Sequence, residues 1–232
     1  MSLEFSVDLI SDLNLERSEQ FDWTGKASSL FCVVAGNVSK DLKKVSEVLE
    51  HLGTQYRGVF YIDGSLEHTT ISNYENRIEK LTSICKPLQN VIYMHNHVVV
   101  LNSIAFVAIN GWYTNIPRQL TAEEYYLLDS CRNEDLGYLS NTIKNLQLHR
   151  DATKIVVVSS CIPSEHLFYK KYVPSCDGVE PGLALVMDTD HKVSNWLYGG
   201  SEIVNDVTFN KRRYVNNPRF KNQPYWPKRI VV

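Results

Sequence analysis

The sequence predicts a single α/β domain with mixed sheets over residues 1–232. Of its 232 residues 44% are hydrophobic and 22% charged, which is ordinary for a globular chain with one large core. In the first half, short β-branched runs alternate with stretches whose apolar residues recur at helical spacing. β-runs dominate the last third, and no internal repeat, low-complexity tract or linker interrupts the chain.

Two helices are predicted among the β-runs of the first half. Apolar residues at 42, 45, 48, 49 and 52 repeat with helical periodicity. Ser39 is placed to cap this helix, and Gly53 to end it as a C′ glycine. A second helix is expected over 72–85, before Pro87. The β-runs are residues 5–10, 30–35, 58–62, 91–93, 98–101 and 104–109.

The second half predicts further helices and strands. Thr121 and Glu124 have the spacing of a capping box at the start of a helix. Leu139, Ile143 and Leu146 indicate one more helix after it. Residues 168–181 resemble a loop. The expected β-runs are 154–158, 193–198, 202–209, 212–215 and 229–232.

Composition excludes several classes of protein. A formal net charge of -2 gives no general attraction to nucleic acid or membrane. No run of about 18 apolar residues is present, and the acidic start MSLEFSVD lacks an apolar signal core, so we expect no membrane association and no secretory signal. The five cysteines are widely spaced without a C-x-x-C pair, which favours a reduced, cytoplasmic protein with Cys32 and Cys85 in its core.

Polar or glycine-containing turns follow five of the β-runs. In open α/β sheets, ligands bind at the carboxyl ends of the strands, so these turns are candidates for a functional site. The turns are Asp12-Leu13-Asn14, Gly36-Asn37, Gly64-Ser65-Leu66-Glu67, Ser159-Ser160-Cys161 before Pro163, and Gly199-Gly200-Ser201-Glu202.

In order, these turns resemble the motifs of the calcineurin-like metallophosphoesterases: D-x-H, G-D, G-N-H-E/D, T-H or H-H before a proline, and G-H-x-H. The late segment Asn217-Pro218-Arg219 is similar to the N-P-R segment that many members carry. The resemblance implies a four-layer αββα sandwich, with two mixed sheets between helices and a site at the rim where the turns converge.

The resemblance also implies that most metal ligands have been replaced. Active members hold two divalent ions with a bridging carboxylate and several imidazoles. Asp12 is retained, whereas Asn14 stands for a His ligand, Asn37 for the bridging Asp, Ser65 for an Asn ligand, Leu66 for the His beside the leaving group, Ser160 and Gly200 for His ligands, and Glu202 for the last His. Amides and hydroxyls bind Mn, Fe or Zn poorly. We therefore expect no metal cofactor, with Asp12 held by hydroxyl or backbone donors.

Two functional hypotheses follow from this comparison. The first is a catalytically inactive metallophosphoesterase-like protein, a pseudoenzyme without catalytic residues, that binds a protein partner or belongs to an assembly; such a degenerate chain would suit a virus-encoded role. The second is a phosphate mono- or diester hydrolase with a weakened or rewired site for Mn or another divalent metal. The retained Asp12 and Glu67 favour it. Asp63, Glu67, His68 and Glu202 could form a single-metal site or be solvated loop residues.

Several other residues allow a functional and a structural interpretation. Cys161 with His166 could be a nucleophile and its base, but nothing indicates a lowered thiol pKa, so a buried spectator is favoured. Ser160 lacks the G-x-S-x-G turn of a serine nucleophile. His95 and His97 fit a hairpin surface better than a metal site.

The C-terminal tail mixes basic and aromatic residues. This pattern can bind single-stranded nucleic acid, or it can protect an edge strand from aggregation, which we favour. The basic residues are Lys211, Arg212, Arg213, Arg219, Lys221, Lys228 and Arg229, and the aromatic ones are Tyr214, Phe220, Tyr225 and Trp226.

Overall fold

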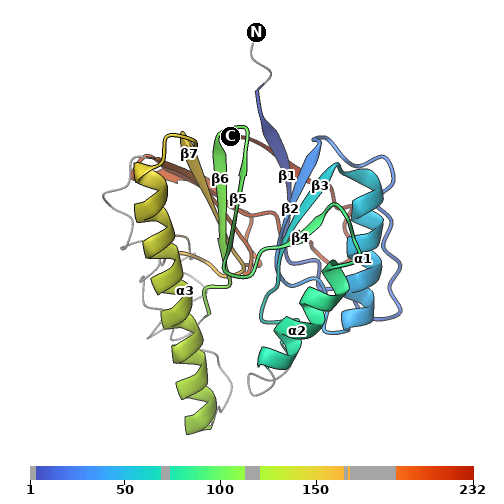
Figure 1. Cartoon of the computed structure of the whole chain (residues 1–232). Helices are drawn as coiled ribbons and strands as arrows, with labels where there is room; N and C mark the ends of the chain where they lie inside the picture. The colour runs from blue at the N-terminus through green and yellow to red at the C-terminus, as the bar shows by residue number, and fades with distance from the viewer. Residues whose placement is uncertain (1–3, 69–73, 113–120, 165–166, 168–191) are drawn as a thin grey trace.

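The computed structural model describes residues 4–68, 74–112, 121–164, 167 and 192–232, and it has four layers (Figure 1). Two mixed sheets pack face to face. Helices α1 (Leu42–Gln55) and α2 (Tyr74–Cys85) cover the outer face of one sheet, and α3 (Ala122–Leu148) covers the other. The predicted αββα sandwich is confirmed.

The first sheet has the strand order β11-β1-β2-β3-β4. Strands β1 to β4 run parallel, with α1 and α2 as the crossovers from β2 to β3 and from β3 to β4, and β11 pairs antiparallel with β1. The first and last strands of the chain therefore lie side by side in one sheet. The strands are β1 Ser6–Ile10, β2 Phe31–Ala35, β3 Gly58–Ile62, β4 Val91–Tyr93 and β11 Lys228–Val231.

The second sheet has the order β5-β6-β7-β8-β10-β9. Its centre, β6-β7-β8-β10, is parallel, and the outer strands β5 and β9 are antiparallel to their neighbours. The strands are β5 His97–Leu101, β6 Ile104–Ile109, β7 Lys154–Ser159, β8 Val193–Tyr198, β9 Asp206–Phe209 and β10 Arg212–Val215.

Alternation along the strands builds separate cores on the two faces of each sheet. On β2, Val33 and Ala35 face the second sheet, whereas Cys32 and Val34 face the helices α1 and α2. Because successive side chains of a strand point to opposite faces, a buried strand needs apolar residues throughout. This explains the uninterrupted apolar runs of the sequence.

The ends of α1 differ from the prediction. Its N-cap is Asp41, whose side chain accepts from the amide of Lys43 at 3.0 Å, and not Ser39. The Ser39 hydroxyl instead donates to the carbonyl of Leu15 at 2.8 Å. Gly53 lies inside the helix, which continues to Gln55, so the prediction that it ends the helix was wrong.

One helix replaces the two that were predicted after residue 120. The capping box of Thr121 and Glu124 is confirmed, but α3 then runs unbroken for 27 residues. Leu139, Ile143 and Leu146 belong to its second half, which packs on the second sheet. Gly137 does not end the helix, because a single glycine costs only about 1 kcal/mol in a helix interior.

Some sequence predictions concern residues outside the described part of the chain. They are the loop over 168–181, the beginning of α2 near residue 72, and His166. Within the described part, no helix combines the length and the apolar character needed to cross a bilayer.

The capping box gives a test of the α3 boundary. Replacing Thr121→Ala removes the side-chain acceptor for the Glu124 amide and should lower the free energy of unfolding by about 1 kcal/mol, as measured by urea denaturation. Thr121→Ser keeps the hydroxyl and should retain most of the stability. An equal loss in both variants would show that the threonine methyl group, and not the cap, matters.

Candidate functional site

The turns that follow β1, β2, β3 and β8 meet at one edge of the sandwich and line a pocket of 540 Å³, called here the Asp12 pocket. Residues of the C-terminal tail complete its wall. The lining comprises Asp12, Leu13, Asn14, Asn37, Ser65, Leu66, Gly200, Ser201, Glu202 and the four residues Pro218, Arg219, Phe220 and Lys221. Seven of the eight predicted site positions are thus brought together, and Ser160 is the exception.

Asp12 is the buried anion of this pocket. Its Oδ1 accepts hydrogen bonds from the Asn37 side-chain amide and the Gly200 backbone N–H, both at 2.8 Å. The predicted backbone donor is thus present, and the side-chain amide of Asn37 is the second donor to Oδ1. Oδ2 is buried and has no hydrogen-bond partner within the described structure. Burial raises the pKa of Asp12 to about 6, although Asn37 and Gly200, and less strongly Ser11 and Ser201, act to lower it.

Asn37 links three of the turns. Its Nδ2 donates to Asp12, and its Oδ1 accepts from the backbone N–H of Leu66 at 3.1 Å. It occupies the position that the resemblance assigns to a bridging Asp. An aspartate here would put two carboxylates against each other, whereas the amide presents an N–H to Asp12 and an oxygen to the β3 turn.

The two sheets approach closely at this edge because glycines replace bulkier residues. A Cβ on Gly36 would lie 2.5 Å from the Cβ of Ser160, and one on Gly199 would overlap the carbonyl oxygen of Ala35. Gly36 has a φ of 74°, a left-handed conformation that glycine adopts without strain. These contacts place the β8 turn within reach of Asp12.

Glu67 is a fully buried carboxylate that holds two turns together. It accepts backbone N–H groups from Val38 at 2.6 Å, Gly64 at 2.9 Å and Asn37 at 3.2 Å. Burial raises its pKa to about 7, against the lowering effect of these donors. Because Glu67 does not line the Asp12 pocket, its role is to join the β2 turn to the β3 turn.

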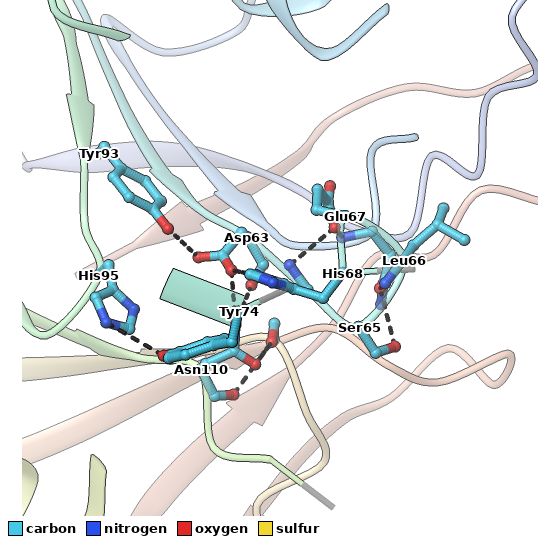
Figure 2. Close-up of polar contacts among 12 residues, drawn as sticks. Asp63, Ser65, Leu66, Glu67, His68, Tyr74, Tyr93, His95 and Asn110 are labelled. Carbon is cyan, nitrogen blue, oxygen red and sulfur yellow. Dashed lines mark hydrogen bonds and ion pairs between the residues drawn. The ribbon is translucent and has the colours of Figure 1, made fainter. Parts of the chain in front are cut away.

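Asp63 and His68 form a second buried pair, shown in Figure 2. The Tyr93 hydroxyl donates to Asp63 at 2.7 Å, and the Asn110 side-chain amide donates at 3.1 Å. Burial favours a raised pKa for Asp63, but the hydrogen bond and charge of His68 outweigh it and lower the pKa. The His68 ring packs edge-on against Trp112, with centroids 5.0 Å apart.

The four residues considered for a rewired metal site therefore lie in different places. Asp63 pairs with His68, Glu67 binds backbone amides, and Glu202 is exposed at the rim of the Asp12 pocket. Among the described residues, no group of three or more His, Cys, Asp or Glu side chains is placed to hold a metal ion.

Ser160 and two residues missed in the sequence extend the polar network. The Ser160 hydroxyl donates to Asn110 Oδ1 at 2.8 Å, so it belongs to the Asp63 network. Asp135 of α3 is buried, accepts the Gly111 amide at 2.7 Å, and has a pKa raised to about 7 by burial. Asn110 could have been noticed in the sequence, because it directly follows a strand and precedes a glycine. For Asp135 the only indication was its position on the apolar face of a helix.

The surroundings of Cys161, His95 and His97 do not indicate a catalytic or metal-binding role. Burial raises the pKa of the Cys161 thiol, which disfavours a nucleophilic thiolate. His95 lies 3.3 Å from the Tyr74 hydroxyl, and His97 is exposed on β5.

Several tail cations lie beside acidic residues. Arg213 and Lys228 contact Asp206 at 2.8 and 2.9 Å, Lys221 contacts Glu16 at 2.6 Å, and Arg219 pairs with Glu19. These pairs, and the place of β11 and β9 at sheet edges, agree with the edge-protecting interpretation.

Asp12 predicts a pH dependence of stability. Its pKa in the folded state, about 6, exceeds the ordinary aspartate value of 3.8, so the folded protein binds the proton more tightly and loses stability as pH rises from about 4 to 6. Asp12→Asn keeps an oxygen for both donors and removes this titration. Urea denaturation should show that, relative to the wild type, the free energy of unfolding of the variant rises by up to about 3 kcal/mol between pH 4 and 7.5.

Asp151→Asn, at an exposed position, serves as the matched control and should leave the pH profile unchanged. The slope that remains in Asp12→Asn is expected from Glu67 and Asp135, whose pKa values are raised in the same direction. Parallel profiles for the wild type and Asp12→Asn would contradict the assignment.

Comparison with known proteins identifies the fold. No protein-family model and no curated protein matches the sequence. Among solved structures, the phosphopantetheinyl hydrolase PptH from Mycobacterium tuberculosis matches with a TM-score of 0.65 and 15% identity, covering 98% of this chain and 96% of its own. A putative 5'-nucleotidase from Staphylococcus aureus, in complex with alpha-ketoglutarate, matches with a TM-score of 0.53 and 10% identity, covering 93% of this chain and 49% of its own. The chain therefore has the α/β fold of the calcineurin-like metallophosphoesterases.

Proposed function

We propose that this chain is a catalytically inactive metallophosphoesterase-like protein that serves as a protein-binding or structural module. One observation carries the proposal: the Asn37 side-chain amide donates to Asp12 Oδ1 at 2.8 Å. It lies at the position where the family resemblance expects a metal-bridging carboxylate. A hydrogen bond between side chains thus joins two turns that a shared ion would otherwise join.

The residues of the Asp12 pocket do not fit a two-metal centre. Such a centre needs several carboxylates and imidazoles converging on two ions. The described lining contains no histidine, and its carboxylates are those of Asp12 and the exposed Glu202. The N–H groups of Asn37 and Gly200 direct positive charge at Asp12 Oδ1, which opposes a cation at that oxygen. We therefore derive no catalytic step through metal ions.

The surrounding carboxylates support a structural use of the same framework. Glu67 binds three backbone N–H groups, and Asp63 binds His68, Tyr93 and Asn110. Each of these interactions lies inside the protein and holds a turn. A rigid scaffold built in this way presents its surface to a partner at little cost in conformational entropy on binding.

The rim of the Asp12 pocket has the mixed character of a binding surface. Phe220 is exposed by 38%, and Arg219, Lys221 and Glu202 lie around it. Aromatic residues and arginine are enriched in protein interfaces, and Phe220 and Arg219 supply one of each here. A further proposal is that the C-terminal tail binds nucleic acid. In that case the affinity should fall steeply as the salt concentration rises.

A second candidate function is a phosphate ester hydrolase with a single rewired metal. Asp12 Oδ2 favours it, because this atom is buried without a hydrogen-bond partner among the described residues. One carboxylate oxygen is a weak site unless the ion brings further ligands. The two functions differ in what added Mn or Zn does to the protein.

Metal titration with thermal unfolding separates the two functions. We expect no rise in melting temperature with Mn or Zn, and no metal-dependent hydrolysis of a phosphodiester, because Asp12 Oδ1 is held by N–H donors. Mn-dependent hydrolysis by the wild type that disappears in Asp12→Ala would refute the proposal.

Asn37→Asp provides the reverse test. The new carboxylate loses the hydrogen bond to Asp12 and faces it, so stability at neutral pH should fall by about 1–3 kcal/mol. Added Mn should then raise the melting temperature of this variant. Asn14→Asp adds the same charge at an exposed position of the same pocket and is the matched control, with a smaller loss expected. Equal losses in the two variants would contradict a special role for Asn37.

A further inference from the structure

A second hollow lies away from the Asp12 pocket, between α2 and the edge of the first sheet. This α2–β4 groove has a volume of 440 Å³ and shares no lining residue with the Asp12 pocket. α2 and β4 are neighbours in Figure 1. Ile78 and Cys85 contribute apolar surface from the helix, and Val91, Ile92 and Tyr93 contribute it from the strand.

The strand that borders this groove has an open edge. β4 is the last strand of its sheet, paired with β3 on one side only among the described strands. The Val59 amide donates to the carbonyl of Asn90 at 2.8 Å, and the Met94 amide donates to that of Tyr61 at 2.7 Å. In a parallel ladder, alternate residues direct their backbone groups to the same neighbour. Tyr93 therefore directs its N–H and C=O away from β3, toward the groove side.

Such an edge is a template for an added strand. Sheet edges in natural proteins are commonly protected by charges, prolines, coverage or the shortness of the edge strand, and β4 has only the last of the devices that its own residues could supply. The three residues of β4 are Val, Ile and Tyr, with neither a charge nor a proline. An extended peptide on this edge would gain backbone hydrogen bonds from Tyr93 and would place alternate side chains against the apolar wall of α2.

The charge of the groove indicates the chemistry of its occupant. Lys86, His95 and His97 belong to the lining, and the lining contains no Asp or Glu. Burial lowers the pKa of His95, so Lys86 is the permanent positive charge. This arrangement favours a peptide that carries an acidic residue beside its apolar ones.

We propose that the α2–β4 groove binds an extended segment of a partner protein, with alternating apolar side chains and an acidic residue near Lys86, as an added strand on β4. This inference rests on the proposed binding function and names the chemistry of the partner. It does not depend on the Asp12 pocket, so the two can fail separately.

Selection from a displayed library of short random peptides tests the inference. We expect the purified protein to enrich sequences with alternating apolar residues and an Asp or Glu. For a synthetic peptide of that consensus, fluorescence anisotropy should show about a tenfold or greater loss of affinity in Thr82→Trp, which fills the groove from α2. Ser83→Trp, at the next exposed position outside the lining, is the matched control and should bind normally.

A charge exchange tests the role of Lys86. Lys86→Glu should weaken the acidic peptide about tenfold and restore binding of the same peptide with Lys in place of its acidic residue. Failure to enrich peptides, or binding that Thr82→Trp leaves intact, would overturn the inference. So would a dimer in sedimentation that Thr82→Trp dissociates, because the groove would then hold a second copy of this chain. Metal-dependent hydrolysis with intact peptide binding would overturn only the proposed function.

Discussion

The hydrogen bonds that Asp12 accepts join the two sheets at the candidate site. Asp12 follows β1 and Asn37 follows β2 in the first sheet, whereas Gly200 follows β8 in the second. These contacts require the backbones to approach closely, which the glycines at 36 and 199 allow. The pocket, the position of the β8 turn and the orientation of Asn37 all depend on this junction.

Burial of carboxylates is the main electrostatic cost of this framework. Asp12, Glu67 and Asp135 each have a pKa raised by burial, to between about 6 and 7, so their charged forms are only partly stabilised by the donors around them. Asp63 differs, because His68 supplies an opposite charge and keeps its pKa low. The carboxylates thus hold turns through N–H donors or a cationic side chain.

The Asp12 pocket and the α2–β4 groove have different physical characters. The Asp12 pocket is lined by charged residues of both signs and lies where strands of both sheets end. The α2–β4 groove is mostly apolar, carries basic groups, and borders an open sheet edge. A protein of this fold can therefore present two independent surfaces, of which only the first derives from the position of a catalytic site.

The sequence alone determined the succession of strands along the chain, the α/β class and, through its resemblance to a known family, the turns that meet at the site. Strands such as Gly58–Ile62 and Arg212–Val215 match their predicted bounds, because residues with high β propensity and the turn residues that flank them are local signals. Cap choice and helix continuity were less predictable, since Ser39 and Asp41 are both good caps and only the packing of α1 selects between them.

Only the tertiary structure decided which groups meet within the site. Gly200 and Asp12 are separated by 188 positions in the chain, and Ser160 and Asn110 by 50. No local propensity reports such contacts. The hydrogen bond from the Asn37 side-chain amide to Asp12 could therefore not be predicted, nor could the placement of the adjacent residues Glu67 and His68 in different hydrogen-bond networks. The physical reason is that hydrogen bonding inside a core is set by how layers pack, whereas the sequence pattern specifies the layers themselves.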